Sequence, residues 1–215
     1  MGTIIYVILG CLLVGIILSA PMGPIGVLVI QRTMEKGRKS GLYTGVGAAV
    51  SDLLYCLLVG FGLAFITDFI KKYKALFQIG GGVMLILFAL FMILHTPTSH
   101  NLHHQDAKKI SFTHDALTGF VLTFLNPLII FFIFTLFTLI VFPSADYKFY
   151  HIILGYLFIV AGALLWWFGI TYLVDKLRSR FNIRTVSIIN KVLGGIIMLV
   201  AVVYIVIGLK DYFHL

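Results

Sequence analysis

Six apolar segments alternate with short polar stretches along the 215-residue chain. Each segment has about 20 residues or more, the length that an α-helix needs to cross the hydrocarbon core of a bilayer. In chain order they cover roughly residues 3–30, 41–67, 75–94, 116–142, 149–174 and 186–209. Because the segments use almost the whole chain, the pattern predicts an all-α membrane protein with six transmembrane helices, forming a single integral membrane domain over residues 1–215.

Composition supports the membrane assignment and narrows the function. Hydrophobic residues make up 60% of the chain and charged residues only 11%, against about 25% charged residues in soluble domains. The net charge of +8 comes from Lys and Arg in short stretches between apolar segments, which is typical of cytoplasmic loops and not of a nucleic-acid surface. We therefore expect membrane lipid and no nucleic acid as partners. The two cysteines lie within apolar segments, where we interpret them as packing residues.

The distribution of Lys and Arg predicts the orientation. The stretches after the first, third and fifth segments hold four, two and five of these residues, 11 in all, and the other side holds 5. Since short basic loops stay in the cytoplasm, both termini are predicted to lie outside a bacterial plasma membrane. The three lysines among residues 71–74 oppose this orientation. A cleaved signal peptide is the competing interpretation of the first segment, but no basic stretch precedes it and its apolar run continues beyond the small residues 19–20.

This topology predicts two inverted halves, approximately residues 1–95 and 115–215, because the first and fourth segments cross the membrane in opposite directions. Each half opens with a segment that contains proline, Pro21 and Pro24 in the first half and Pro127 in the second. Each continues with a segment in which glycines are regularly spaced. Inverted repeats that meet at interrupted helices are the layout of many secondary transporters, with the substrate near the membrane midplane.

Two helix breaks are predicted at similar depth. Pro21 and Pro24 flank Gly23 in the first segment, and a proline inside a helix removes a backbone donor and clashes with the preceding turn. Asn126 and Pro127 repeat the device in the fourth segment, where the Asn126 amide can bind a freed carbonyl or a substrate group. Backbone groups freed in a bilayer must be buried in protein or line a wet cavity. A simple packing kink is the alternative at each place.

Asp52 is the acid that lies deep within an apolar segment. Counted from the predicted cytoplasmic edges, Asp52, Pro21 and Pro127 each lie 11 residues in, or about 16 Å at 1.5 Å per residue. Intramembrane acids usually face a transport pathway or carry a proton. Tyr55 follows three residues later on the same helical face. We predict that these side chains and the two breaks bind substrate and proton, whereas a purely structural aspartate is the alternative.

Other functional classes have weaker support. Five histidines occur near the middle of the chain, at His95, His100, His103, His104 and His114. Imidazole suits zinc, nickel or copper, so a divalent metal cation exporter that uses this predicted cytoplasmic loop is the alternative function, although the spacing matches no closed metal site. An enzyme is not expected, because one buried acid cannot act as both acid and base and no hydrolase motif is present. A membrane scaffold without transport stays open. We expect no cofactor.

The motifs resemble those of the lysine exporter (LysE/RhtB) family of amino-acid translocators. The similar stretches are Pro21-Met22-Gly23-Pro24-Ile25-Gly26, residues 32–38, Gly41 through Gly47, Ser51-Asp52, Asn126-Pro127, Gly155, Trp166-Trp167 and residues 190–195. The resemblance covers nearly the full length and implies a six-helix inner-membrane exporter of amino acids or similar small solutes. It places the translocation centre at residues 21–24, Asp52 and Asn126-Pro127. One departure is Leu128, because many amino-acid exporters of the family have Lys after the Asn-Pro pair.

The resulting hypothesis is a proton-coupled secondary exporter, an antiporter, that works by alternating access. The ammonium of a small zwitterionic solute would be attracted by Asp52, and its carboxylate by backbone N–H groups near the breaks. No Walker motif is present, so ATP is not expected to be the direct energy source. A homo-oligomer is compatible with the sequence, which names neither the solute nor the coupling stoichiometry.

Overall fold

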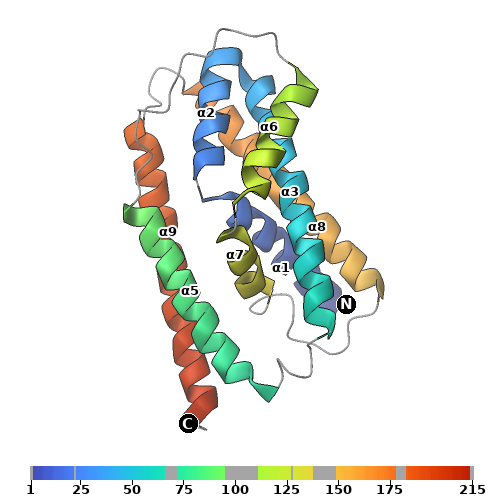
Figure 1. Ribbon diagram of the computed structural model, residues 1–215, viewed down its shortest axis with the longest axis vertical. Coiled ribbons are helices and arrows are strands. Elements are labelled where there is room, and N and C mark those ends of the chain that lie inside the picture. The colour runs from blue at the N-terminus through green and yellow to red at the C-terminus, as the bar shows by residue number, and fades with distance from the viewer. Residues whose placement is uncertain are drawn as a thin grey trace.

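The structure is a computed structural model of the chain, in which residues 2–21, 23–65, 72–94, 111–126, 128–137, 149–177 and 183–213 are described. These residues form α-helices and no strand. The helices are α1 (Gly2–Ser19), α2 (Pro24–Lys36), α3 (Arg38–Phe65), α5 (Lys74–Leu94), α6 (Phe112–Phe124), α7 (Leu128–Leu136), α8 (Phe149–Lys176) and α9 (Ile183–Phe213). Their arrangement is drawn in Figure 1. An all-helical arrangement of the described residues suits a bilayer, because helices satisfy their backbone hydrogen bonds internally.

Four described helices are long and apolar enough to cross a membrane: α3, α5, α8 and α9. The pair α1 and α2 makes a fifth if it is counted as one span, bent by 79° at the break between them. The fourth predicted segment is described as α6 with 13 residues and α7 with 9 residues, each too short to span alone. The multi-pass membrane architecture is therefore confirmed, with four or five candidate spans among the described residues, and the six spans in two inverted halves stay a prediction.

One predicted boundary was wrong. Residues 95–115 were expected to form a polar loop, but α6 begins at Phe112, so that Asp115 lies in its first turn. The Asp115 side chain is buried, as is Thr123 near the end of the same helix. A buried acid at a helix start is uncommon unless it has a partner. The polar stretch therefore ends in a structured, packed turn.

The helices pack around α3. Half of the most apolar 18-residue stretch of α3 is buried, compared with 28% of the corresponding stretches of α5, α8 and α9. In Figure 1, α3 lies between α6 and α8, while α5 and α9 form an antiparallel pair at one side, with α7 between that pair and α3. A polar group on the buried face of α3 is therefore shielded from lipid by neighbouring helices.

Glycines bring α3 and α6 into backbone contact. A β-carbon on Gly47 of α3 would overlap the carbonyl oxygen of Ala116, and one on Gly119 of α6 would overlap the carbonyl oxygen of Thr44. Small residues at such positions let two helix backbones approach closely in a membrane. The two glycines thus fix α6, and with it the break that follows α6, against α3.

Helices α1 and α8 meet in the same way. A β-carbon on Gly15 of α1 would overlap the carbonyl oxygen of Ile159, and one on Gly162 of α8 would overlap the carbonyl oxygen of Leu12. Figure 1 shows that α8 runs in the opposite direction to α3, and that α1 and α2 run opposite to α6 and α7. Each long helix, α3 or α8, is therefore held through glycines by a helix that precedes a break.

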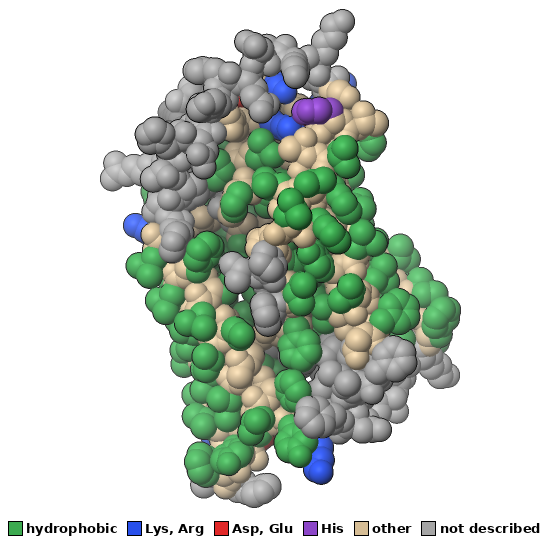
Figure 2. All heavy atoms as spheres, viewed as in Figure 1, with side chains coloured by type: hydrophobic (Ala, Val, Ile, Leu, Met, Phe, Trp, Pro, Cys, Tyr) green, Lys and Arg blue, Asp and Glu red, His purple; other side chains and the backbone are tan. Residues whose placement is uncertain are grey.

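The surface has the distribution expected for lipid contact. Figure 2 shows hydrophobic side chains covering the middle of the visible face, with basic side chains and a histidine near its upper end. Large apolar side chains of α9 such as Leu199 and Ile196 are more than half exposed, at 68% and 57%. In water such exposure would be an aggregation hazard, whereas hydrocarbon accepts it. Both termini lie in the lower half of Figure 1.

Candidate functional site

Asp52 lies in the middle of α3 and is buried, with 4% of the residue exposed. The hydroxyl of Ser19 donates a hydrogen bond of 3.4 Å to its carboxylate oxygen Oδ2. Ser19 is the last residue of α1 and is itself buried. Asp52 thus points into the helix bundle, at the point where α1 ends, and not toward lipid.

The first break separates α1 from α2 at residues 20–23. The backbone N–H of Gly23 donates to the carbonyl of Pro21 at 2.9 Å, and Pro24 is the first residue of α2. Proline suits this position because the first N–H groups of a helix have no partner within the helix. A β-carbon on Gly23 would meet no atom within 4 Å, so there is open space beside the break.

The second break separates α6 from α7. The N–H of Asn126 donates to the carbonyl of Thr123 at 3.1 Å, and the carbonyl of Asn126 accepts from the N–H of Ile129 at 3.3 Å. These tight turns end one helix and begin the next. Asn126 is half-buried, and Pro127 lies outside the described residues.

Tyr55 connects α3 to the second break. Its hydroxyl donates a hydrogen bond to the backbone carbonyl of Phe124, the last residue of α6. The two rings are stacked, with centroids 5.2 Å apart. Tyr55 lies one helical turn after Asp52 and is buried. One turn of α3 therefore touches the ends of both interrupted helices, Asp52 through Ser19 and Tyr55 through Phe124.

A buried ionic network that was not predicted from the sequence joins α2, α6 and the first turns of α3. The guanidinium of Arg32 in α2 is 3.3 Å from the carboxylate of Asp115 in α6, and the side chains are 5% and 2% exposed. Arg32 also donates to the hydroxyl of Thr44 at 2.8 Å and to the carbonyl of Asp115 at 3.1 Å. The hydroxyl of Ser40 donates to Asp115 at 2.6 Å. The network ties α2, α3 and α6 together.

The sequence contained a weak signal for this network. Arg32 was assigned to a basic loop and Asp115 to a polar one, although both are charged residues directly beside apolar segments. Charged groups are almost never fully buried unless they are paired. Their pairing over 83 residues of sequence could not be read from local pattern.

The histidine-rich stretch gives no support to a metal site within the described residues. No group of three His, Cys, Asp or Glu side chains there could hold a metal ion. Four of the five histidines lie at residues 95–104, outside the described part of the chain. His114 is described, and its Nδ1 is 3.5 Å from the carboxylate of Asp115 with the side chain 56% exposed. The alternative of a metal exporter that uses this stretch therefore stays a prediction.

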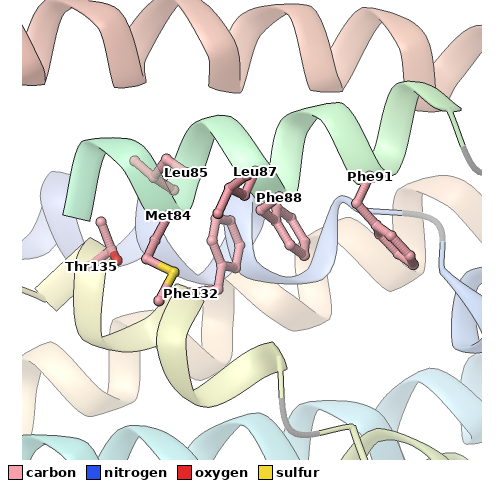
Figure 3. Close-up of a pocket in the computed structure, with 7 residues that line it drawn as sticks. All are labelled: Met84, Leu85, Leu87, Phe88, Phe91, Phe132 and Thr135. Carbon is pink, nitrogen blue, oxygen red and sulfur yellow. The ribbon is translucent and has the colours of Figure 1, made fainter. Parts of the chain in front are cut away.

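An apolar pocket of about 270 Å³ lies between α5 and α7. Its lining residues are Met84, Leu85, Leu87, Phe88, Phe91, Phe132 and Thr135. Figure 3 shows the Phe88 and Phe132 rings close together between the two helices, stacked with centroids 4.5 Å apart. None of the predicted site residues lines this pocket, and its apolar walls suit hydrocarbon and not a zwitterion.

Comparisons with known proteins agree with the membrane architecture. Residues 16–208 match the model of a family described as "LysE type translocator". The chain is 26% identical over 212 residues to the "Putative amino acid efflux protein YcgF" of Bacillus subtilis (strain 168), covering 94% of this chain and 93% of that protein. A shorter match, 37% identical over 62 residues, covers 29% of this chain and 28% of the "Uncharacterized membrane protein YahN" of Escherichia coli (strain K12). No solved structure matches the chain.

Proposed function

The chain belongs to the LysE type translocator family, and from that premise we propose that it is a secondary exporter of amino acids or similar small zwitterionic solutes, coupled to protons. The name of the Bacillus subtilis relative, which matches over nearly the full length of both chains, supports the substrate class. A bacterial plasma membrane with both termini outside is the location that fits the basic loops.

One observation carries the proposal. A single turn of α3 places the Asp52 carboxylate at the end of α1 and the Tyr55 hydroxyl at the end of α6. A buried acid is costly in a membrane and is kept where it serves a pathway. Its position at the end of α1, one turn from the tyrosine that contacts the end of α6, supports a polar site near the midplane.

The architecture behind this site is proposed to be six spans in two inverted halves. Helices α1 and α2 with α3 and α5 would correspond to α6 and α7 with α8 and α9. Three features support the correspondence: α3 and α8 have 28 residues each, corresponding helices run in opposite directions, and glycines join α3 to α6 as they join α8 to α1. Such halves can rock against each other around a fixed site, which is the basis of alternating access.

Transport would proceed by exchange of two cations at Asp52. From the cytoplasmic side, the ammonium of the solute pairs with the ionised carboxylate, and the solute carboxylate meets the first N–H groups of α2, where the helix dipole favours negative charge. After the bundle opens outward, a proton binds Asp52 and the solute leaves. The inward return carries the proton, which is released to the cytoplasm. These backbone N–H groups bind the solute carboxylate in this chain, which has Leu128 where many amino-acid exporters of the family have Lys.

The experiment is transport in proteoliposomes with Asp52→Asn and a matched control. Amino-acid pools inside and outside cells with and without the protein first identify the solute. Asp52→Asn is then expected to abolish solute-driven proton movement and to reduce solute flux at least tenfold, because the amide cannot exchange an ammonium for a proton. Asp175→Asn is the control, since Asp175 is an exposed acid in the last turn of α8. Undiminished flux and proton coupling in Asp52→Asn would refute the proposal.

A further inference from the structure

Arg38 makes an unusual contact at the start of α3. Gly37, between α2 and α3, has a φ of 95°, a conformation that glycine adopts without strain. The sharp turn places the guanidinium carbon of Arg38 at 4.3 Å from the ring centroid of Phe168 and 5.2 Å from that of Tyr172. Both aromatic residues lie one turn apart on α8. Arginine over two aromatic faces is a favourable cation–π arrangement.

The guanidinium of Arg38 has hydrogen-bond donors that are not bonded to any acceptor among the described residues. Within the part of the chain that the structure describes, the Nε and one terminal nitrogen, Nη2, are buried and have no hydrogen-bond partner. Arg32, six residues earlier, differs because it is engaged by Asp115 and Thr44. Buried donors of a charged group normally have an acceptor, since leaving them without one is costly. The Arg38 fork is therefore suited to a ligand that brings oxygen atoms.

The surroundings of Arg38 indicate which ligand. Phe168 and Tyr172 are 54% and 48% exposed, so they lie on the outer face of the bundle. Lys176, one turn further along α8, holds its Nζ at 5.8 Å from the Tyr172 ring centroid. Two cations thus flank one exposed aromatic ring, at the ends of two membrane helices. Asp175, an exposed acid, is the neighbouring negative residue on α8.

We propose that Arg38, Phe168, Tyr172 and Lys176 form a binding site for the headgroup of an anionic phospholipid. Because the Arg38 residue is only partly buried, its side chain can turn Nε and Nη2 toward a phosphate at the helix ends, and this fork matches phosphate oxygens in pairs. Lys176 adds a second positive charge, and the exposed rings contact the glycerol and upper acyl region. A lipid is favoured over a free phosphate because the site faces outward at the helix ends, where headgroups lie. In the proposed orientation of the chain, the lipid belongs to the cytoplasmic leaflet.

The test measures the thermal stability of the full chain in nanodiscs of phosphatidylcholine, with and without phosphatidylglycerol. Phosphatidylglycerol is expected to raise the Tm of the wild-type protein. Arg38→Gln is expected to bind the lipid more weakly, so that the phosphatidylglycerol fraction that gives half of the Tm increase rises about tenfold or more, since charge-assisted bonds are lost. Lys39→Gln is the matched control: it removes the same charge from the next residue, which is exposed. Arg38→Lys keeps the charge but not the planar fork, so its half-saturating phosphatidylglycerol fraction is expected to lie between those of Arg38→Gln and Lys39→Gln.

Several results would overturn the proposal. Equal losses in Arg38→Gln and Lys39→Gln would mean that the lipid senses only overall surface charge. Stabilisation by sodium phosphate in pure phosphatidylcholine, equal to that by phosphatidylglycerol, would identify a free anion as the ligand. A wild-type Tm that does not respond to phosphatidylglycerol would show that no such site exists. An Arg38→Gln protein with the wild-type Tm in pure phosphatidylcholine establishes that the variant is folded. Solute transport is not part of the measurement, so its outcome is independent of the proposed export.

Discussion

Removing one member of the Arg32–Asp115 pair should strongly destabilise the protein. In Asp115→Asn, the buried guanidinium of Arg32 loses its counter-ion and keeps two neutral acceptors, the Thr44 hydroxyl at 2.8 Å and the carbonyl of residue 115 at 3.1 Å. Breaking a buried pair typically costs about 3–5 kcal/mol. Because the two neutral acceptors remain, we expect the lower end, about 3 kcal/mol. For a chain of this size that corresponds to a loss of about 6–12 °C in Tm.

A double-mutant cycle separates the pair from its surroundings. Arg32→Met and Asp115→Leu, made singly and together, form the cycle. The double variant removes both charges, and such apolar replacement of a buried pair is often neutral or stabilising. The double variant should therefore be more stable than Asp115→Leu alone, with a coupling between the two sites of about 1–3 kcal/mol. Stability is measured by thermal unfolding in one detergent, followed by intrinsic tryptophan fluorescence.

Glu35→Gln supplies the control for this cycle. Glu35 is an exposed acid in the same helix as Arg32 and accepts a hydrogen bond of 3.1 Å from Gln31. Exposed pairs contribute little, so this variant should stay within about 0.5 kcal/mol of the wild type. If Asp115→Asn is as stable as Glu35→Gln, or if the effects in the cycle simply add, the buried pair does not hold α2, α3 and α6 together.

Three further outcomes are expected. Tyr55→Phe removes the bond to the Phe124 carbonyl and should cost about 1 kcal/mol in unfolding experiments while lowering the transport rate; an unchanged rate would separate Tyr55 from the site. Gly47→Val forces a side chain into a backbone contact and should destabilise by more than about 1 kcal/mol, whereas Gly169→Ala, where a β-carbon meets no atom within 4 Å, should not. Alanine at the four histidines among residues 95–104 should leave cellular tolerance to zinc and nickel unchanged, and a loss of tolerance would favour metal export.

The features that the sequence predicted well are those with a local cause. Prolines interrupt the helix in which they occur, so the first break appears where Pro21 and Pro24 stand, and the second appears directly after α6. The burial of Asp52 could be predicted because a charged group within an apolar segment is costly to expose to lipid. Its contact with Ser19 and the contact of Tyr55 with Phe124 extend the prediction, because they connect one helix to both breaks.

The features that the sequence did not reveal depend on contacts between distant parts of the chain. Arg32 and Asp115 look like ordinary loop charges until α2 and α6 are packed against α3. Arg38 likewise reads as one more cytoplasmic cation, and only the packing of α3 against α8 sets it over Phe168 and Tyr172. The local sequence indicates which residues are charged or lie in apolar segments, whereas the packing of distant helices determines which residues contact one another.

The charges buried among the described residues are consistent with the proposal that a single acid serves for exchange. Of the Asp, Glu, Lys and Arg residues there, three are buried: Arg32, Asp52 and Asp115. Arg32 and Asp115 neutralise each other, so the remaining charge is that of Asp52, whose hydrogen-bond donor is the neutral Ser19 hydroxyl. An ionised carboxylate in that setting needs one positive charge, which a proton or a solute ammonium can supply equally, but not both at once. In the proposed export mechanism, competition between the proton and the solute ammonium for this one carboxylate would couple inward proton movement to outward solute movement.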